Sequence, residues 1–291
     1  MASLKAIRTR IRSIKSTQKI TRAMKMVAAA RLRRSQEAAL AARPYEHLMH
    51  EVLDSVGARV ELARYPLFQQ REVKRVEIVA ITSDRGLCGG FNGIIEKRVR
   101  KLTQEAEDKG QKVTLRIIGR KGADYFRRRE VTIRRSYTGL LGDLKFSTAQ
   151  EIALELSMLF LAGEIDQVLL VYNEFVSAVS QRAVEKQLLP ILPPPPPADI
   201  ESVRTPVDYI YEPGADAILD DLLPRYITNQ MWASLLESLA SENAARMTAM
   251  DAATNNAKEM IDKLTILMNR TRQAAITSEL VEIVSGAEAL K

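Results

Sequence analysis

Two long stretches without helix-breaking residues constrain the fold of this 291-residue chain most strongly. Neither glycine nor proline occurs within residues 2–43 or within residues 225–285. As one continuous helix the second stretch would be ~90 Å long, because an α-helix rises ~1.5 Å per residue. We therefore predict that the two ends of the chain pair as an antiparallel coiled coil. A chain of this kind is better understood as a shaft or strut than as an enzyme.

The spacing of residues within the two stretches supports this pairing. In the C-terminal stretch, small, polar and flexible residues follow the alternating four- and three-residue steps of a coiled-coil seam, which allows close but weakly bound helices. This predicted seam consists of Leu236, Ala240, Asn243, Met247, Met250, Thr254, Ala257, Ile261, Leu264, Met268, Thr271 and Ala275. In the N-terminal stretch an apolar stripe runs through Leu4, Ile7, Ile11 and Ile14 and then, on a shifted face, through Ile20, Met24, Val27 and Leu32.

Prolines and a glycine mark the expected ends of these helices. We expect Pro44 to kink or interrupt the first helix and Gly57 to end it. Pro224 is expected either to start or to kink the last helix. Five consecutive prolines at residues 193–197 predict an extended polyproline spacer, to which we assign no function.

The middle of the chain alternates between strand and helix patterns. Strands are predicted at residues 76–82, 113–118, 130–134, 167–172 and 180–192, and helices at residues 94–108, from Gly119 to Arg128, and at residues 147–161. Alternating elements of this length favour a small central α/β (Rossmann-like) domain with a mostly parallel sheet. The predicted organisation is an N-terminal coiled-coil helix (1–57), a central α/β domain (74–200) and a C-terminal coiled-coil helix (210–286).

The net charge of +7 is concentrated at one end of the chain. The first 36 residues hold eleven of the 43 basic residues and none of the acidic ones, so the rest of the chain is slightly acidic. A basic helix is typical of a protein-binding surface, an organelle presequence or a nucleic-acid-binding arm. The apolar stripe is longer than that of a typical presequence, which argues against a presequence. The basic residues surround the helix instead of following one side, which argues against a nucleic-acid-binding arm. The residues favour a protein partner and leave the other two possibilities open.

No pattern of catalytic, metal-binding or cofactor-binding residues emerges. The glycine-rich loop at residues 86–93 lacks the lysine of a phosphate-binding loop and the spacing of a dinucleotide fingerprint, so we expect a structural turn. His47 and His50 share a helix face without further ligands. Cys88, the single cysteine, is expected to be a small buried thiol, and the Arg127–Arg129 run a solvated edge. The longest apolar runs are far shorter than the ~20 residues that cross a bilayer.

Three segments resemble the gamma subunit of F-type ATP synthase. They are residues 4–30, which include LKAIR and IKSTQKITRAMKMVAAA, the loop SDRGLCGGFN at residues 83–92, and ITSELVEIVSGA at residues 276–287. They occur in the family's order and include both predicted helices and the central domain. The resemblance implies that the first helix belongs to the mature shaft.

The resemblance also implies the function and the partners. It implies a non-catalytic rotor that couples ion-driven rotation to ATP synthesis or hydrolysis, without a cofactor or a metal. Its partners would be three alpha and three beta subunits around one copy of this chain, an epsilon subunit and the membrane c-ring. The chain would lie at the cytoplasmic face of a bacterial inner membrane, associated only through the complex. The alternative is a basic coiled-coil nucleic-acid-binding protein.

The resemblance assigns roles to individual residues. Positions that would contact the beta subunit are Met24, Lys25, Arg31, Arg33, Arg34, Arg272, Gln273 and Thr277. Leu280, Ile283 and Val284 match an apolar tip that would turn within a hydrophobic collar. From about Asn269 onward, the last helix is expected to extend beyond Met1 as a single helix.

Overall fold

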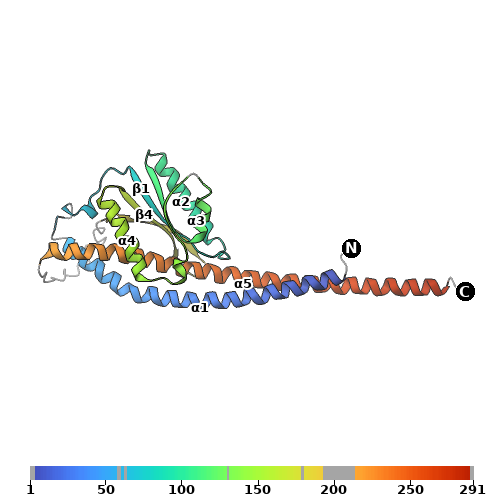
Figure 1. Cartoon of the computed structure of the whole chain (residues 1–291). Coiled ribbons are helices and arrows are strands. Elements are labelled where there is room, and N and C mark those ends of the chain that lie inside the picture. Colours follow the sequence, from blue (N-terminus) through green and yellow to red (C-terminus); the bar gives the residue numbers. More distant parts are fainter. Residues whose placement is uncertain are drawn as a thin grey trace, which may run out of the picture. The chain divides into compact units, whose positions relative to one another are not determined.

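The computed structural model describes residues 4–57, 60–61, 64–129, 131–177, 180–192 and 214–288. It consists of two compact units. The tip unit comprises Met1–Ala29 and Arg246–Lys291, and the body unit comprises Ala30–Ala245. Two long helices, α1 (Leu4–Gly57) and α5 (Ala215–Glu288), each contribute to both units (Figure 1).

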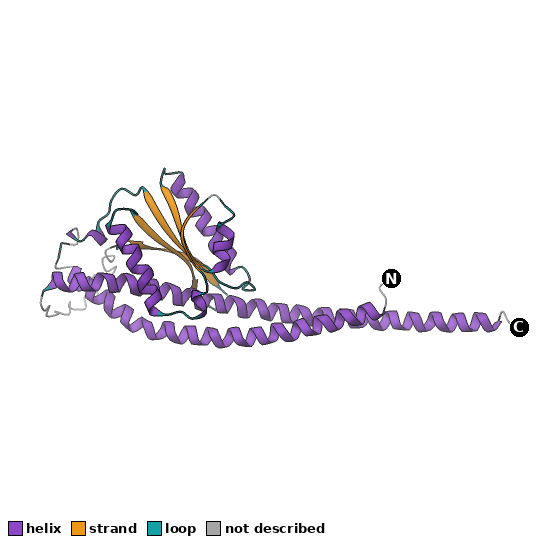
Figure 2. Cartoon of the chain, in the orientation of Figure 1, coloured by secondary structure: helices purple, strands orange, loops and turns teal. Residues whose placement is uncertain are grey.

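The body unit contains a five-stranded sheet in the order β3-β2-β1-β4-β5. The strands are β1 (Arg75–Ile81), β2 (Lys112–Ile118), β3 (Thr132–Tyr137), β4 (Gln167–Phe175) and β5 (Gln181–Leu189). All neighbouring pairs are parallel except β4 and β5, which are antiparallel. The predicted α/β domain with a mostly parallel sheet is thus confirmed (Figure 2).

Helices cover both faces of this sheet. The helices α2 (Phe91–Glu107) and α3 (Arg120–Phe126) pack on one face, where Phe91, Ile95 and Phe126 are buried. On the other face α4 (Phe146–Leu161) packs together with the body-unit ends of α1 and α5. Two short 3₁₀ helices, η2 (Pro66–Phe68) and η3 (Leu140–Gly142), complete the unit. The two faces of the sheet each carry a hydrophobic cluster. Because side chains alternate along a strand, β1, β2 and β4 each contribute buried residues to both clusters.

Several predicted boundaries shift by a few residues. The helix expected from residue 94 begins at Phe91, because the Phe91 side chain is fully buried and its N–H donates to the Cys88 carbonyl at 3.2 Å. The strand expected at residues 130–134 lies at Thr132–Tyr137. The helix α1 ends at Gly57 as predicted. Of the kink or interruption expected at Pro44, the interruption does not occur, because α1 continues through this residue. Pro224 lies inside α5 and therefore does not start it. Residues 193–197 lie outside the described residues.

The predicted seam of α5 is at least partly buried from Leu236 to Thr271, whereas its last residue, Ala275, is exposed. The shifted stripe predicted for α1 is partly wrong. Ile20 and Val27 are 57% and 54% exposed, while Thr21 and Ala28 are buried. These two residues continue the three- and four-residue spacing that starts at Leu4, so the seam does not shift. The apolar residues indicated the wrong face of α1 here, because small and polar residues occupy this part of the seam.

Hydrogen bonds within the tip unit join the two helices at these polar seam positions. The Thr21 and Thr254 hydroxyl oxygens lie 2.8 Å apart, and each hydroxyl also contacts a carbonyl of its own helix. Toward the C-terminus, residues 272–287 of α5 are exposed, as expected for a single helix. In Figure 1 this end of α5 extends beyond the start of α1.

A buried network of charged side chains connects the sheet to α4. Glu77 on β1 and Arg116 on β2 are both fully buried and joined by a 3.0 Å ion pair. Arg116 also contacts Glu155 of α4 at 2.7 Å, and Arg134 of β3 contacts Glu77 at 2.7 Å. Buried carboxylates and guanidinium groups need such partners, because an unpaired charge in a protein interior is strongly destabilising.

This network predicts how the stability of the body unit depends on pH. The hydrogen bond from Arg116 lowers the pKa of Glu155 below its ordinary value of 4.5, although partial burial opposes the shift. Because the pKa is lower in the folded state, ionised Glu155 stabilises the fold above its unfolded-state pKa. This contribution is lost as the pH falls through the folded-state pKa. We therefore expect the urea midpoint of wild type to fall more steeply below about pH 4.5 than that of Glu155→Gln. Fluorescence of Trp232, the single tryptophan, reports the transition, and parallel pH profiles would contradict the prediction.

Candidate partner interface

The basic residues of α1 in the tip unit are mostly without an acidic partner. Seven of them are exposed and form no ion pair with a described residue: Lys5, Arg8, Arg10, Arg12, Lys15, Lys19 and Arg22. Their positive charge is therefore available to attract an acidic surface. This electrostatic property was evident in the sequence, because no acidic residue lies within the first 36 positions.

Lys25 differs from these residues. Its ammonium group donates a 2.6 Å hydrogen bond to Asp251 of α5, and both side chains are close to half exposed. A partly exposed pair of this kind contributes about 0–1 kcal/mol to stability. Met24, its neighbour, is half-buried. Lys25 thus contributes to the pairing of the helices, a role that the sequence analysis missed because Asp251 is distant in the chain.

Three further predicted contact residues lie on α1 in the body unit. Arg31, Arg33 and Arg34 are exposed. Arg33 forms an exposed pair with Glu37 one helical turn away, at 2.9 Å. Arg31 and Arg34 form no ion pair with any residue that the structure describes. Their guanidinium groups can therefore pair with carboxylates of another molecule.

The C-terminal end of α5 combines polar and apolar exposed residues. Arg272, Gln273 and Thr277 are exposed, and the Thr277 hydroxyl donates to the Gln273 carbonyl at 2.9 Å. The large apolar residues of the same segment are all at least half exposed: Ile276, Leu280, Val281, Ile283 and Val284. Water is a poor environment for such a cluster, which is typical of a surface that a partner covers.

The glycine-rich loop forms a hydrogen-bonded turn. Asn92 accepts the Ser83 N–H at 2.9 Å, and its amide group donates to the Ser83 hydroxyl at 2.8 Å. Leu87 and Gly89 adopt positive φ angles of 64° and 58°. Cys88 is buried, as expected. These internal contacts account for the loop by local packing, in agreement with the prediction of a structural turn.

The structure does not test the histidine pair considered in the sequence. The side chains of His47 and His50 lie outside the described residues. Within the described residues no group of three or more His, Cys, Asp or Glu side chains could hold a metal ion. None of the described helices contains a stretch long and apolar enough to span a bilayer.

Comparisons with known proteins agree along the whole length of the chain. The family described as ATP synthase matches residues 3–290. The chain is 51% identical to the ATP synthase gamma chain of Anaeromyxobacter sp. (strain Fw109-5), with 100% of both chains covered. It is also 51% identical to the ATP synthase gamma chain of Chlorobium phaeobacteroides (strain BS1), covering 100% of this chain and 99% of that one.

Solved structures show the same fold. A chain of the central stalk and c-ring of Tetrahymena thermophila mitochondrial ATP synthase matches with a TM-score of 0.60 and 26% identity, over 80% of this chain and 99% of that chain. A chain of the Euglena gracilis mitochondrial ATP synthase, from the OSCP, F1 and c-ring assembly, matches with a TM-score of 0.67 and 19% identity, over 99% and 94%. At that identity the second match supports the fold alone. Together with the full-length relatives, these findings show that the chain belongs to the ATP synthase gamma chain family.

Proposed function

We propose that this chain is the central rotor shaft of an F-type ATP synthase and that it couples ion-driven rotation to ATP synthesis or hydrolysis. The observation that carries the proposal is the two-helix coiled coil with a basic α1 and an exposed apolar end on α5, in a chain of the gamma family. The comparisons give no support to the alternative of a nucleic-acid-binding protein.

The coupling follows from the asymmetry of the shaft. A pair of unlike helices presents different side chains in different directions: a basic α1 on one side, and on the other an α5 with more acidic than basic residues. Three equivalent catalytic subunits around it would each meet a different face. The shaft would therefore stabilise a different conformation in each of them through different contact free energies. Rotation would take each site in turn through binding, chemistry and release. By linkage, hydrolysis could equally rotate the shaft.

The proposed assembly places one copy of the chain within three alpha and three beta subunits. Segments 1–57 and 210–286 would form the shaft, and segment 74–200 would lie beside the membrane c-ring and an epsilon subunit. The complex would be at the cytoplasmic face of a bacterial inner membrane. Arg31 and Arg34, which lack an ion pair with any described residue, would attract an acidic segment of the beta subunit.

Reconstitution tests this function. Purified chain is mixed with alpha and beta subunits, and complex mass and ATPase activity are measured. We expect a complex of one copy with three alpha and three beta subunits, whose ATPase activity exceeds that of the alpha and beta subunits alone. A chain that forms no complex but binds RNA or DNA with a steep salt dependence would refute the proposal and favour the nucleic-acid alternative.

A substitution at Met24 tests the proposed contact with the beta subunit. Met24→Lys places an ammonium group beside an acidic segment of the partner. The new ion pair would favour one rotational position over the others, so we expect fewer ions pumped per ATP hydrolysed than in wild type. Met26→Lys is the matched control, because Met26 is 68% exposed and lies on a different face of the same helix. Equal pumping by the Met24→Lys and wild-type complexes in sealed vesicles would rule out this contact.

A further inference from the structure

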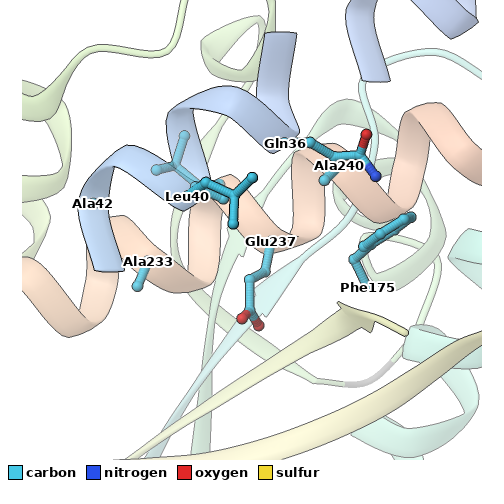
Figure 3. A pocket seen from close by; sticks show the side chains of 9 residues that line it. Gln36, Leu40, Ala42, Phe175, Ala233, Glu237 and Ala240 are labelled. Atoms are coloured by element: carbon cyan, nitrogen blue, oxygen red, sulfur yellow. The ribbon is translucent and has the colours of Figure 1, made fainter. Parts of the chain in front are cut away.

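A cavity of about 280 Å³ lies in the body unit between α1, α5 and the end of β4. Figure 3 shows Gln36 and Leu40 of α1, Glu237 and Ala240 of α5, and Phe175 of β4 around it. Small residues explain why the space is open. Four of its lining residues are alanines, two on each helix, where longer side chains would fill the gap between the helices.

The lining combines apolar surface with one charged group. Leu40, Leu236 and Phe175 contribute aliphatic and aromatic surface. Gln36 contributes an amide, and among the described residues that line the cavity Glu237 is the only charged one. Ligand sites in proteins share this combination of a mostly apolar wall with a few polar groups that orient the ligand. The charge of that group selects the complementary charge in the ligand.

The negative charge of Glu237 acts on a buried tyrosine, Tyr172. Tyr172 of β4 is 5% exposed. Burial, followed by the negative charge of Glu237, raises the pKa of Tyr172 well above its usual range, so its hydroxyl keeps its proton. The Glu237 carboxylate has lone pairs for more than one hydrogen bond, so it can accept from a ligand as well as from the protein.

We propose that this cavity is a binding site for a small hydrophobic amine. The ammonium group would donate to the Glu237 carboxylate, and the apolar part would lie against Leu40, Leu236 and Phe175. The ring of Phe175 adds a second attraction for a cation that lies over its face. A carboxylate ligand of the same shape would be repelled by Glu237. The site is independent of the contacts assigned to the shaft, because none of its lining residues is among them.

Binding to the full-length chain tests the site. The probes are 4-phenylbutylamine, the uncharged 4-phenylbutanol and the anionic 4-phenylbutyrate, measured by calorimetry at neutral pH. For an amine of this size we expect a dissociation constant of about 0.1–1 mM. The alcohol should bind about tenfold more weakly, and the carboxylate should not bind detectably. Glu237→Gln should lower the affinity for the amine about tenfold and leave that for the alcohol unchanged.

Two further variants complete the experiment. Glu37→Gln is the matched control, because Glu37 lies on α1 outside the cavity and pairs with Arg33; its affinity for the amine should equal that of wild type. Ala233→Leu adds a side chain to the wall and should remove binding of both the amine and the alcohol. The proposal is overturned if wild type binds the amine no more tightly than the alcohol, a comparison that needs no variant. It is equally overturned if Ala233→Leu, with its unfolding midpoint near that of wild type, still binds the amine.

Discussion

Arg116→Ala is expected to destabilise the body unit by about 3–5 kcal/mol, which would lower its thermal midpoint by roughly 6–20 °C. The substitution removes the guanidinium group that contacts both Glu77 and Glu155. Glu77 is fully buried and, among the described residues, would keep only Arg134 and Thr114 as partners. A buried carboxylate that loses its main counterion is left with most of its desolvation penalty uncompensated. Urea titration of the full-length chain measures the effect through Trp232, which packs edge-to-face on Phe146 within this unit.

Two comparisons separate the buried network from ordinary surface charge. Arg182→Ala removes an exposed ion pair with Glu174 and should lower the free energy of unfolding by less than about 1 kcal/mol. In the double variant Glu77→Leu/Arg116→Met both buried charges are replaced by apolar groups, so we expect it to be more stable than Arg116→Ala. If the free energy of unfolding of Arg116→Ala lay within about 1 kcal/mol of the wild-type value, the prediction would be wrong. Water would then reach this network and solvate the charges.

Deletion of residues from Arg272 onward is expected to reduce ATP synthesis by the assembled complex about tenfold, equivalent to a loss of ~1.4 kcal/mol of coupling free energy. The deleted segment lies beyond the coiled-coil seam, and the described residues within it are exposed. Its removal should therefore leave the thermal midpoint of the remaining chain nearly unchanged. Under our proposal its apolar residues turn within a collar formed by the alpha and beta subunits, and without them the shaft would tilt. ATP synthesis driven by an imposed ion gradient in vesicles measures the loss.

A full-length variant distinguishes the apolar bearing from the mere length of the helix. In Leu280→Gln/Ile283→Gln/Val284→Gln the helix keeps its length and loses its apolar side chains, which are 58%, 68% and 61% exposed. We expect this variant to lose a substantial part of the activity that the deletion loses. The matched control is Glu279→Gln/Glu282→Gln, which alters two exposed acidic residues of the same segment and leaves the apolar surface intact. Undiminished synthesis by the deletion variant would contradict the role of this segment as a bearing.

The long helices and the class of the central domain could be predicted because local properties specify them. Two stretches without glycine or proline became α1 and α5, and the alternating apolar segments became a mostly parallel sheet. A helix interior depends mainly on propensity and on the absence of breakers. Proline was a partial exception: Pro44 does not interrupt α1, and Pro224 does not start α5, because both lie inside helices.

The contacts between distant residues could not be predicted in the same way. The pairing of Lys25 with Asp251 and of Thr21 with Thr254 depends on the register between two helices that are far apart in the sequence. A seam rich in alanine, serine and threonine gives a weak apolar signal, so the sequence pattern favoured Ile20 and Val27 where the fold uses Thr21 and Ala28. The candidate partner contacts of α1 and the end of α5 stay predictions, since they involve other molecules.

The sequence by itself thus determined that this protein is a basic two-helix shaft joined to an α/β domain, because helix propensity, strand patterning and charge are properties of neighbouring residues. Only the tertiary structure decided which charges are paired and which remain available to a partner. It also decided that Glu77 and Arg116 are buried together, and that alanines of α1 and α5 leave a cavity beside Glu237. These features depend on the distances between segments that are remote along the chain, which no local pattern encodes.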